Sequence, residues 1–320
     1  MPFISESGGR IHAHKLEYNL VDHCNLACRE CSHLSPFLRP HVLPLDNFTL
    51  DINALAQVYR VQRLRFVGGE PLLNREICAY VKAARASGMT RDIEVVSNGT
   101  LLASVSDDLL ALINSLALSL YPDCGPADDV LERTRQRCLS FNVKLRIEHI
   151  KRFRKTQTSA PIEDQQLLDG VFKSCLIAHT WACQAIYDGR FYLCSRPIYS
   201  DTYLAGFGQA PLGFKTLDGI ALHEPHLLER LRAYLGSKTP LNACRYCLGT
   251  VGRYQPHGQL PSTLRWKPAP DAQPVALKVD GARMRYLIRW QRVELAVLRR
   301  LPSRRLSRMF ALAQTALIGD

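Results

Sequence analysis

The sequence lacks the features that would place the chain in a membrane or make it a flexible, low-complexity protein. It has no low-complexity tract, and no uninterrupted apolar run reaches the ~20 residues that a transmembrane helix requires. The N-terminus, Met1-Pro2-Phe3-Ile4-Ser5-Glu6, has neither the basic region nor the apolar region of a signal peptide. Because 47% of the 320 residues are apolar and 22% are charged, we expect a globular, cytoplasmic protein with a sizeable core.

Cysteine is the residue type that this chain has in unusual number. Disulfides are typical of short secreted domains, whereas this chain is long and shows no export signal. Many of its eleven cysteines also occur at short spacings. We therefore expect metal ligation rather than disulfide bonding.

The net charge of the chain is strongly positive and unevenly distributed. A formal charge of +12 arises from 41 Lys and Arg against 29 Asp and Glu, and such a surplus raises the local concentration of anionic partners. The segment from Arg283 to Arg308 holds nine arginines and one acid, Glu294. A nucleic acid, a phosphorylated small molecule and a membrane surface are all compatible with this charge.

Strand and helix patterns alternate in the first half of the chain. Leu16, Tyr18 and Leu20 alternate with polar residues, which predicts a strand. Further strands are expected at 64–67, 93–96, 116–120 and 143–147, and helices near 50–58, 75–86, 107–114 and 128–137. This alternation predicts a mostly parallel sheet whose ligands collect outside the carboxyl ends of the strands. Periodicity alone leaves an open sheet and a partial barrel as alternatives.

Three motifs fall at these predicted strand ends: the cysteines of Cys24-x3-Cys28-x2-Cys31, then Gly68-Gly69-Glu70-Pro71, then Ser97-Asn98-Gly99-Thr100. A cubane iron–sulfur cluster needs thiolates on a tight loop, and the first motif supplies three, which leaves one iron open. On spacing alone, zinc is the alternative, with His23 or His33 as the fourth ligand.

The cysteine loop followed by the Gly-Gly-Glu-Pro motif resembles the radical S-adenosylmethionine (SAM) superfamily. The resemblance implies a partial (β/α)6 barrel over about residues 16–150 and a [4Fe-4S] cluster that cleaves SAM to a 5′-deoxyadenosyl radical. It also implies an electron donor such as flavodoxin or ferredoxin. Carried over to this sequence, Cys24, Cys28 and Cys31 bind the cluster, while Gly68, Gly69 and Glu70 border the amino group of SAM.

Further cofactor contacts are expected from the same resemblance. Ser97 and Asn98 are predicted to contact the ribose or the carboxylate of SAM, with a simple Asn-Gly turn as the alternative. The residue before the third cysteine is usually aromatic in this superfamily and packs near adenine, but here it is Glu30. Because backbone groups at that position can contact adenine, we expect activity to be intact.

A second group of cysteines resembles the auxiliary-cluster domain of this superfamily in its short form, called twitch. It comprises Cys175-x13-Gly189-x4-Cys194 and, later in the chain, Cys244-x2-Cys247. The resemblance implies that these four cysteines hold a second, fully coordinated [4Fe-4S] cluster. Too few cysteines follow Cys175 for the seven-cysteine version called SPASM. A zinc site made by the same four cysteines is the alternative.

The remaining cysteines have no assigned partner. Cys183 is in excess of the four ligands: it replaces Cys175, it is an ordinary buried thiol, or it donates a hydrogen atom to the substrate radical. Cys78, Cys124 and Cys138 lack paired spacing, and we expect them to be core or incidental residues.

Three domains are predicted: a radical SAM partial barrel (1–165), a small α+β auxiliary-cluster domain (166–260), and a linker with basic C-terminal helices (261–320). The second contains a predicted hairpin that turns on Asp188-Gly189. The helical pattern from Met284 to Ala316 predicts a basic tail docked on the barrel, with contact to a membrane surface as the alternative. Aromatic residues are sparse there, which disfavours nucleic acid as a partner.

We expect an enzyme that abstracts a carbon-bound hydrogen from a small, anionic biosynthetic substrate such as a sugar, an aminocyclitol or a nucleoside. An auxiliary cluster that accepts an electron gives dehydrogenation, whereas a thiol that returns a hydrogen atom gives epimerisation. The second hypothesis is a peptide maturase that forms thioether or carbon crosslinks; with about fifteen residues before the first strand, we expect no leader-binding domain. A zinc-stabilised nucleic-acid-binding protein is the hypothesis from another class.

Overall fold

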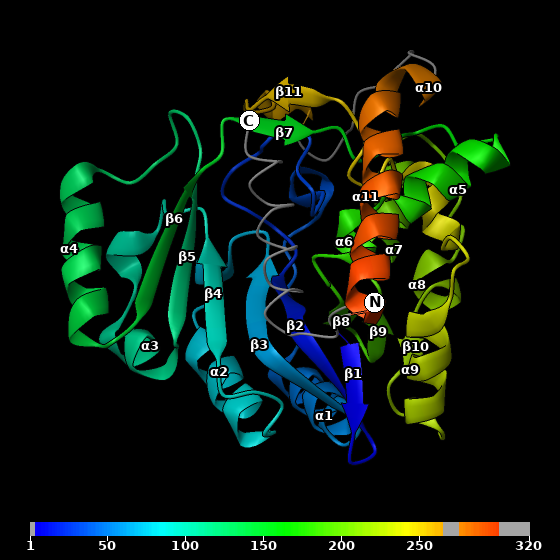
Figure 1. The fold of residues 1–320 in the computed structure, drawn as a ribbon. Coiled ribbons are helices and arrows are strands. Elements are labelled where there is room, and N and C mark those ends of the chain that lie inside the picture. The colour runs from blue at the N-terminus through cyan, green and yellow to red at the C-terminus, as the bar shows by residue number, and fades with distance from the viewer. Residues whose placement is uncertain (1–3, 265–274, 301–320) are drawn as a thin grey trace.

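One large sheet organises the computed structural model, which describes residues 4–264 and 275–300 (Figure 1). Its strand order is β10-β9-β8-β2-β3-β4-β5-β6, and β1 pairs with β2 outside this path. These strands are β1 (Ile4–Ser7), β2 (Arg10–Val21), β3 (Tyr59–Gly68), β4 (Ile93–Ser97), β5 (Ser115–Leu120), β6 (Lys144–His149), β8 (Ala185–Tyr187), β9 (Arg190–Tyr192) and β10 (Ile220–Ala221). A separate two-stranded sheet pairs β7 (Arg152–Arg154) with β11 (Tyr254–Pro256).

The helices fall into two sets. Those of the barrel follow successive strands and are α1 (Leu45–Ala56), α2 (Ile77–Ala86), α3 (Asp107–Leu112) and α4 (Asp128–Ser140). Those of the second half are α5 (Gln165–Lys173), α6 (Leu176–His179), α7 (Arg196–Ala205), α8 (Phe214–Leu217), α9 (Leu227–Gly236), α10 (Val275–Lys278) and α11 (Gly281–Arg300). Short 3₁₀ turns are η1 (Ser35–Phe37), η2 (Pro71–Leu73), η3 (Leu102–Ser104), η4 (Asn242–Tyr246) and η5 (Ser262–Leu264).

The predicted α/β class with a mostly parallel sheet is confirmed. Strands β2 to β6 pair in parallel in chain order, and β8 adds in parallel on the other side of β2. Among the described strands, β6 and β10 end the sheet and do not pair with each other, so the barrel is incomplete. The carboxyl ends of the parallel strands consequently share one edge.

The two faces of the sheet differ in chemistry because side chains alternate along each strand. Leu16, Tyr18 and Leu20 are fully buried on one face, where the Tyr18 ring contacts Phe48 of α1 with ring centroids 4.3 Å apart. The other face carries charged side chains at matched register, since Glu17 pairs with Arg65 and Arg65 pairs with Glu94. The inside of the barrel is therefore polar, while the helices cover the apolar face.

Glu94 is the centre of the ionic network inside the barrel. Its side chain is 1% exposed, and its carboxylate accepts hydrogen bonds from Arg65 Nε at 2.7 Å, Arg146 Nη1 at 3.1 Å and Arg63 Nη1 at 3.3 Å. Arg65 also donates to Glu17 at 2.8 Å. Burial opposes ionisation of Glu94, but the guanidinium groups of Arg65, Arg146 and Arg63 outweigh burial and lower its pKa. The acids and bases of this face compensate one another.

The predicted hairpin is confirmed, and it continues the main sheet. Strands β8 and β9 turn on Asp188 and Gly189, both with positive φ, as a two-residue hairpin turn requires. Ala185 of β8 pairs with Glu17 of β2, so this part of the second region shares the sheet with the barrel. A second apolar cluster forms around α5, with Leu168, Val171, Leu176, Leu248, Val251 and Leu287 among its members. The boundaries at 165 and 260 stay predictions.

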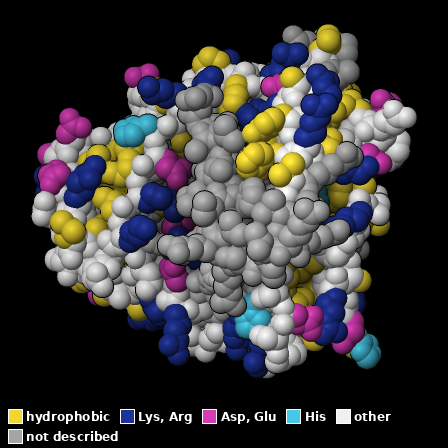
Figure 2. All heavy atoms as spheres, in the orientation of Figure 1, with side chains coloured by type: hydrophobic (Ala, Val, Ile, Leu, Met, Phe, Trp, Pro, Cys, Tyr) yellow, Lys and Arg dark blue, Asp and Glu magenta, His cyan; other side chains and the backbone are white. Residues whose placement is uncertain are grey.

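The C-terminal part of the chain is described only as far as residue 300. Helix α11 packs against α5 of the second region, where the sequence predicts contact with the barrel. Residues 265–274 and 301–320, and the side chains of Arg292 and Glu294, lie outside the described set. On the face in Figure 2, the described Lys and Arg side chains are spread among Asp and Glu and form no single patch. No described helix combines the length and apolarity needed to cross a membrane.

Replacing Glu94 with Gln should lower the free energy of unfolding by about 3–5 kcal/mol, because the buried guanidinium of Arg65 loses a carboxylate partner. Urea unfolding at pH 7, followed by circular dichroism, measures this loss. Glu132→Gln on the exposed face of α4 is the matched control and should change stability by less than about 0.5 kcal/mol.

The pH dependence gives the same test a second readout. The pKa of Glu94 lies below its usual value of 4.5 in the folded protein, so its stabilisation is present above that pH and is lost as the pH falls through the folded pKa. The difference between wild type and Glu94→Gln should therefore shrink in acid. A constant difference from pH 7 to pH 3 would contradict the ionic assignment.

Candidate active site

The loop that follows β2 carries the first three cysteines at the carboxyl edge of the sheet. Cys28 is 6% exposed, while Cys24 and Cys31 are partly exposed. Burial raises the pKa of both Cys24 and Cys28 to about 12, and the neighbouring thiol of Cys31 adds to the rise. The structure therefore brings the three predicted ligands into one loop region, close enough for their thiols to interact.

Gly68 and Gly69 allow the end of β3 to lie directly against this loop. A Cβ on Gly69 would lie 1.7 Å from the carbonyl oxygen of His23, and one on Gly68 would lie 2.3 Å from that of Val21. The backbone N–H of Gly69 donates to the Val21 oxygen at 2.8 Å, and that of Glu70 donates to the His23 oxygen at 3.1 Å. The two glycines are thus required by backbone packing, whatever contacts they make with a cofactor.

Glu70 is fully buried and bonded to backbone groups. One carboxylate oxygen accepts the N–H of Asn98 at 2.7 Å, and the other accepts the N–H of Leu72 at 3.1 Å. Burial raises the pKa of Glu70, and these donors oppose the rise. The side chain consequently joins the ends of β3 and β4.

Asn98 connects the end of β4 to the cysteine loop. Its Nδ2 donates to Asn25 Oδ1 at 2.8 Å and lies 3.5 Å from Cys24 Sγ, while its Oδ1 accepts the Thr100 N–H at 3.0 Å. Ser97 Oγ accepts the N–H of Gly99. The contacts of Asn98 with Asn25 and Cys24 exceed those of a simple turn. Asn25 could not be predicted from the sequence, because a residue between two cysteines carries no spacing signal.

Glu30, which stands where the superfamily usually has an aromatic residue, adopts a left-handed conformation with φ of 59°. Its carboxylate pairs with Lys155 Nζ at 3.2 Å. This ion pair joins the cysteine loop to the segment after β7. The side chain that departs from the family pattern thus has a structural contact of its own.

A distant segment closes over the other side of the loop. The N–H of Arg29 donates to the Gly258 oxygen at 2.8 Å, and the N–H of Leu260 donates to the Ala27 oxygen at 2.7 Å. Between these contacts, Gln259 Nε2 lies 3.4 Å from Cys28 Sγ and 3.6 Å from Cys124 Sγ. Cys124, expected to be core or incidental, therefore lies beside the loop.

The donors around these sulfurs fit an iron–sulfur cluster. The Leu26 N–H lies 3.4 Å from Cys24 Sγ, and the amides of Asn98 and Gln259 point to Cys24 and Cys28. Hydrogen bonds to sulfur stabilise thiolates bound to iron and tune their redox potential. Within residues 4–264 and 275–300, no three His, Cys, Asp or Glu side chains already surround one metal position.

The second cysteine group also converges. Cys175, Cys194, Cys244 and Cys247 line one small cavity of about 30 Å³. Burial raises the pKa of Cys175 to about 12, and the Cys247 thiol adds to the rise. The N–H of Gly249 lies 3.3 Å from Cys247 Sγ. Four thiols from widely separated positions thus face the same small space.

Asp22 joins the two cysteine groups. One oxygen of its buried carboxylate accepts the hydroxyl of Tyr187 at 2.7 Å, and the other accepts the hydroxyl of Tyr199 at 2.9 Å. Tyr187 ends β8 and Tyr199 lies on α7, whereas Asp22 directly precedes the first cysteine loop. This carboxylate therefore fixes the loop to the hairpin and helix that flank Cys194.

Cys183 lies about half-way along the neighbouring strand β2, and not on the cysteine loop. Ala185 pairs with Glu17, so Cys183 is level with Lys15, six residues before Val21. Burial raises its pKa to about 11, and Glu17 adds to the rise. Cys175, not Cys183, lines the second cavity. The hydrogen-donor role stays a prediction.

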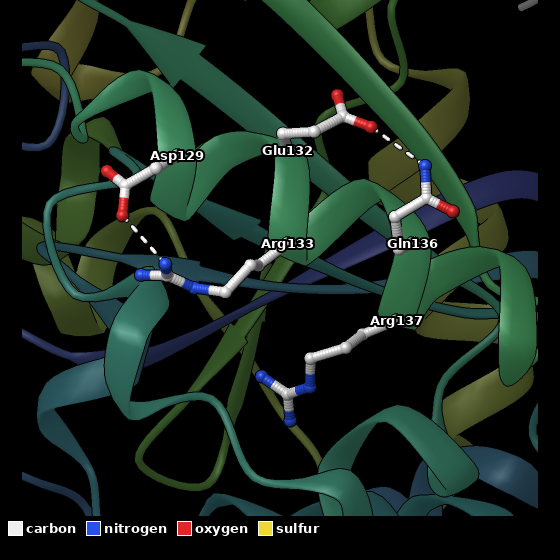
Figure 3. A pocket seen from close by; sticks show the side chains of 5 residues that line it. All are labelled: Asp129, Glu132, Arg133, Gln136 and Arg137. Atoms are coloured by element: carbon white, nitrogen blue, oxygen red, sulfur yellow. Dashed lines mark hydrogen bonds and ion pairs between the residues drawn. The ribbon is translucent and has the colours of Figure 1, made fainter.

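A separate hollow of about 450 Å³ lies on the outer surface of α4 (Figure 3). Its lining residues all belong to that helix. Four of them form the Asp129–Arg133 ion pair and the Glu132–Gln136 hydrogen bond, and Arg137 pairs with Asp107 at the start of α3. An open hollow lined by side chains of one helix that already have partners offers no catalytic chemistry.

Comparison with known proteins agrees with the geometry of the first site. Residues 18–158 match the family described as the radical SAM superfamily. This segment is a radical SAM domain. It contains the cysteine loop, the Gly-Gly-Glu-Pro motif and the end of β4.

Among curated relatives of the chain, GTP 3′,8-cyclase from Crocosphaera subtropica is 31% identical over 116 residues, which is 34% of each chain. GTP 3′,8-cyclase 3 from Mycobacterium tuberculosis is 32% identical over 96 residues, which is 28% of this chain and 25% of the relative. The chain thus spans between a quarter and about a third of these relatives. The crystal structure of BtrN in complex with AdoMet and 2-DOIA gives a TM-score of 0.43 at 12% identity and covers 72% of this chain and 83% of BtrN.

Gly69→Ala should disrupt the radical SAM domain, because the added methyl group collides with the His23 backbone. We expect a loss of roughly 1–3 kcal/mol in stability and reduced iron retention after anaerobic reconstitution. Thermal unfolding and iron analysis measure the two effects. Gly125→Ala is the matched control, since a Cβ there meets nothing within 4 Å. Equal iron content in both variants would contradict the packing role.

Cys183→Ala tests the position of that thiol. Because Cys183 lies level with Lys15, we expect the variant to retain both 5′-deoxyadenosine formation and product formation, with a stability loss of roughly 1 kcal/mol. Chromatography of both compounds after reaction with SAM and reductant is the measurement. Retained cofactor cleavage with loss of product would instead establish the hydrogen-donor role.

Proposed function

We propose that this chain is a radical SAM enzyme with two iron–sulfur clusters that abstracts a carbon-bound hydrogen from a small biosynthetic substrate. Cys24, Cys28 and Cys31 hold the first cluster, and SAM lies against Gly68 to Glu70 and the end of β4. When bound, these groups supply a 5′-deoxyadenosyl radical for hydrogen abstraction and, at the second site, an acceptor for the electron that a dehydrogenation releases.

One observation carries the proposal: four further cysteines line a single small cavity, whose flanking elements Asp22 fixes to the first cysteine loop. Four thiolates satisfy all irons of a cubane, which suits electron transfer rather than substrate ligation. Dehydrogenation of a sugar, an aminocyclitol or a nucleoside is therefore the leading reaction, with epimerisation as its alternative. The domain boundaries at 165 and 260 belong to the same proposal.

The chain's own residues prepare the first site. Glu70 holds the N–H of Asn98, and Asn98 in turn holds Asn25 within the loop. Gln259 supports the opposite side through Ala27 and Cys28. The loop is therefore braced on both sides before any cofactor binds, which reduces the reorganisation that binding costs.

A nucleotide substrate is the second candidate. The matched relatives are GTP 3′,8-cyclases, and the positive charge of the chain favours an anionic substrate. A ring-forming reaction on such a nucleotide would replace dehydrogenation as the outcome of hydrogen abstraction. A peptide crosslinking reaction lacks a supporting contact among the described residues.

Anaerobic reconstitution with iron and sulfide tests the proposal. We expect a brown protein with about eight irons per chain, falling to about four in Cys244→Ala/Cys247→Ala and in Cys24→Ala/Cys28→Ala/Cys31→Ala. Only the latter variant should lose 5′-deoxyadenosine formation from SAM and reductant. Cys78→Ala, on α2, is the matched control and should keep both properties.

Three results would decide against the proposal. A colourless protein that holds zinc would support the alternative metal sites and a binding function. Iron that does not fall in the Cys244→Ala/Cys247→Ala variant would remove the second cluster. Incubation with nucleotides, sugars and aminocyclitols labelled with deuterium then identifies the substrate class by deuterium transfer to 5′-deoxyadenosine.

A further inference from the structure

Arg196 is a buried cation without an acidic partner. It is the first residue of α7 and is 5% exposed, and in the described chain only Lys278 is a comparably buried basic residue. No Asp or Glu of the described residues forms an ion pair with its guanidinium. Its one side-chain hydrogen bond is to Gln157 Oε1 at 3.5 Å, at the long limit for such a bond.

This arrangement contrasts with the other charges inside the molecule. Arg65 is also well buried, but it bonds to the carboxylates of both Glu17 and Glu94. An uncompensated buried charge costs several kcal/mol, so native proteins pair such groups or place them against a bound ion. Among the described residues, Arg196 has an amide where Arg65 has two carboxylates.

The second cysteine site supplies a place for that anion. Arg196 lines the same 30 Å³ cavity as the four cysteines. Its backbone N–H donates to the thiol of Cys194. Four thiolates that held a metal would place negative charge in the cavity that Arg196 lines.

Gln157, which contacts the guanidinium, is itself held by Ser200 of the same helix as Arg196. Ser200 Oγ donates to the Arg196 carbonyl oxygen at 2.9 Å, and Gln157 Nε2 donates to Ser200 Oγ at 3.1 Å. Gln157 is 3% exposed and contacts Cys247 through a backbone bridge. The cation, its amide partner and one cluster ligand thus form one connected unit.

We propose that Arg196 raises the reduction potential of the iron–sulfur cluster held by Cys175, Cys194, Cys244 and Cys247. This inference rests on the proposed function. A cubane with four thiolate ligands is an anion, and reduction adds one more negative charge to it. A fixed cation in a water-excluded site stabilises the reduced form more than the oxidised form, which makes the cluster a better electron acceptor. Arg196 acts through the cluster and is a positioning residue.

A potentiometric titration followed by electron paramagnetic resonance tests the inference. The full chain with Cys24→Ala, Cys28→Ala and Cys31→Ala isolates the second cluster. In this background, Arg196→Gln should shift the midpoint potential to more negative values, and Arg196→Lys should restore most of the shift because it keeps the charge. Arg190→Gln is the matched control, since Arg190 lies on the adjacent hairpin, bonds to the Gly219 carbonyl and does not line the cavity.

Substitutions at Gln157 test the same inference without replacing Arg196. Gln157→Glu should bring a carboxylate to the guanidinium and lower the potential in the same direction as Arg196→Gln. Gln157→Leu removes the amide without adding charge and should shift the potential far less. This pair decides the question if Arg196→Gln does not retain the cluster.

The metal-free protein gives an independent readout. Without a cluster the cation is uncompensated, so Arg196→Met should unfold at the same temperature as the wild type or a higher one. A large loss of stability would show that Arg196 is structural and would overturn the inference.

The outcomes separate the two levels of the proposal. Absence of iron at the second site in the wild type would refute the proposed function. A second cluster whose potential is the same in wild type, Arg196→Gln and Gln157→Glu would refute the role of Arg196 alone. That result would point to an anionic group of the substrate as the partner of the cation.

Discussion

The contact between Gly69 and the backbone of His23 is the constraint on which the first site depends. It brings the end of β3 to a separation from the cysteine loop that any side chain would prevent. Glu70 is fully buried and accepts a hydrogen bond from the N–H of Asn98. The side chain of Asn98 donates a hydrogen bond to Asn25 of the cysteine loop. The order of the site therefore originates in one backbone contact, and the polar contacts follow from it.

The second cysteine site is positioned by the continuity of the sheet, as the first site is positioned by Gly68 and Gly69. Strand β8 pairs with β2, so the hairpin that leads to Cys194 starts beside the strand that leads to Cys24. The carboxylate of Asp22 adds a second connection through Tyr187 and Tyr199. Two groups of cysteines far apart in sequence are thereby connected through one continuous sheet and one shared carboxylate.

Local patterns in the sequence predicted much of the fold. The alternation at Leu16 to Leu20, the helical spacings that follow and the Asp188-Gly189 turn all have short-range causes, and each element forms where expected. Contacts between distant segments could not be predicted in this way. Gln259 meets Cys28 across 231 residues, and neither residue type nor spacing signals the contact. The proximity of Cys124 to the loop that carries Cys28 could not be predicted from the sequence for the same reason.

Buried charges are paired differently inside the barrel and beside the second cysteine group. Inside the barrel, Glu94 and Glu17 compensate the arginines at matched register, so that interior is stable without a ligand. Beside the second cysteines, the partner of Arg196 among the described residues is an amide and not a carboxylate. A protein retains such an imbalance at a cost in stability, and here the imbalance coincides with four thiols that a metal would convert into negative charge. The electrostatics of the chain thus point to the second cysteine site independently of the spacing of its cysteines.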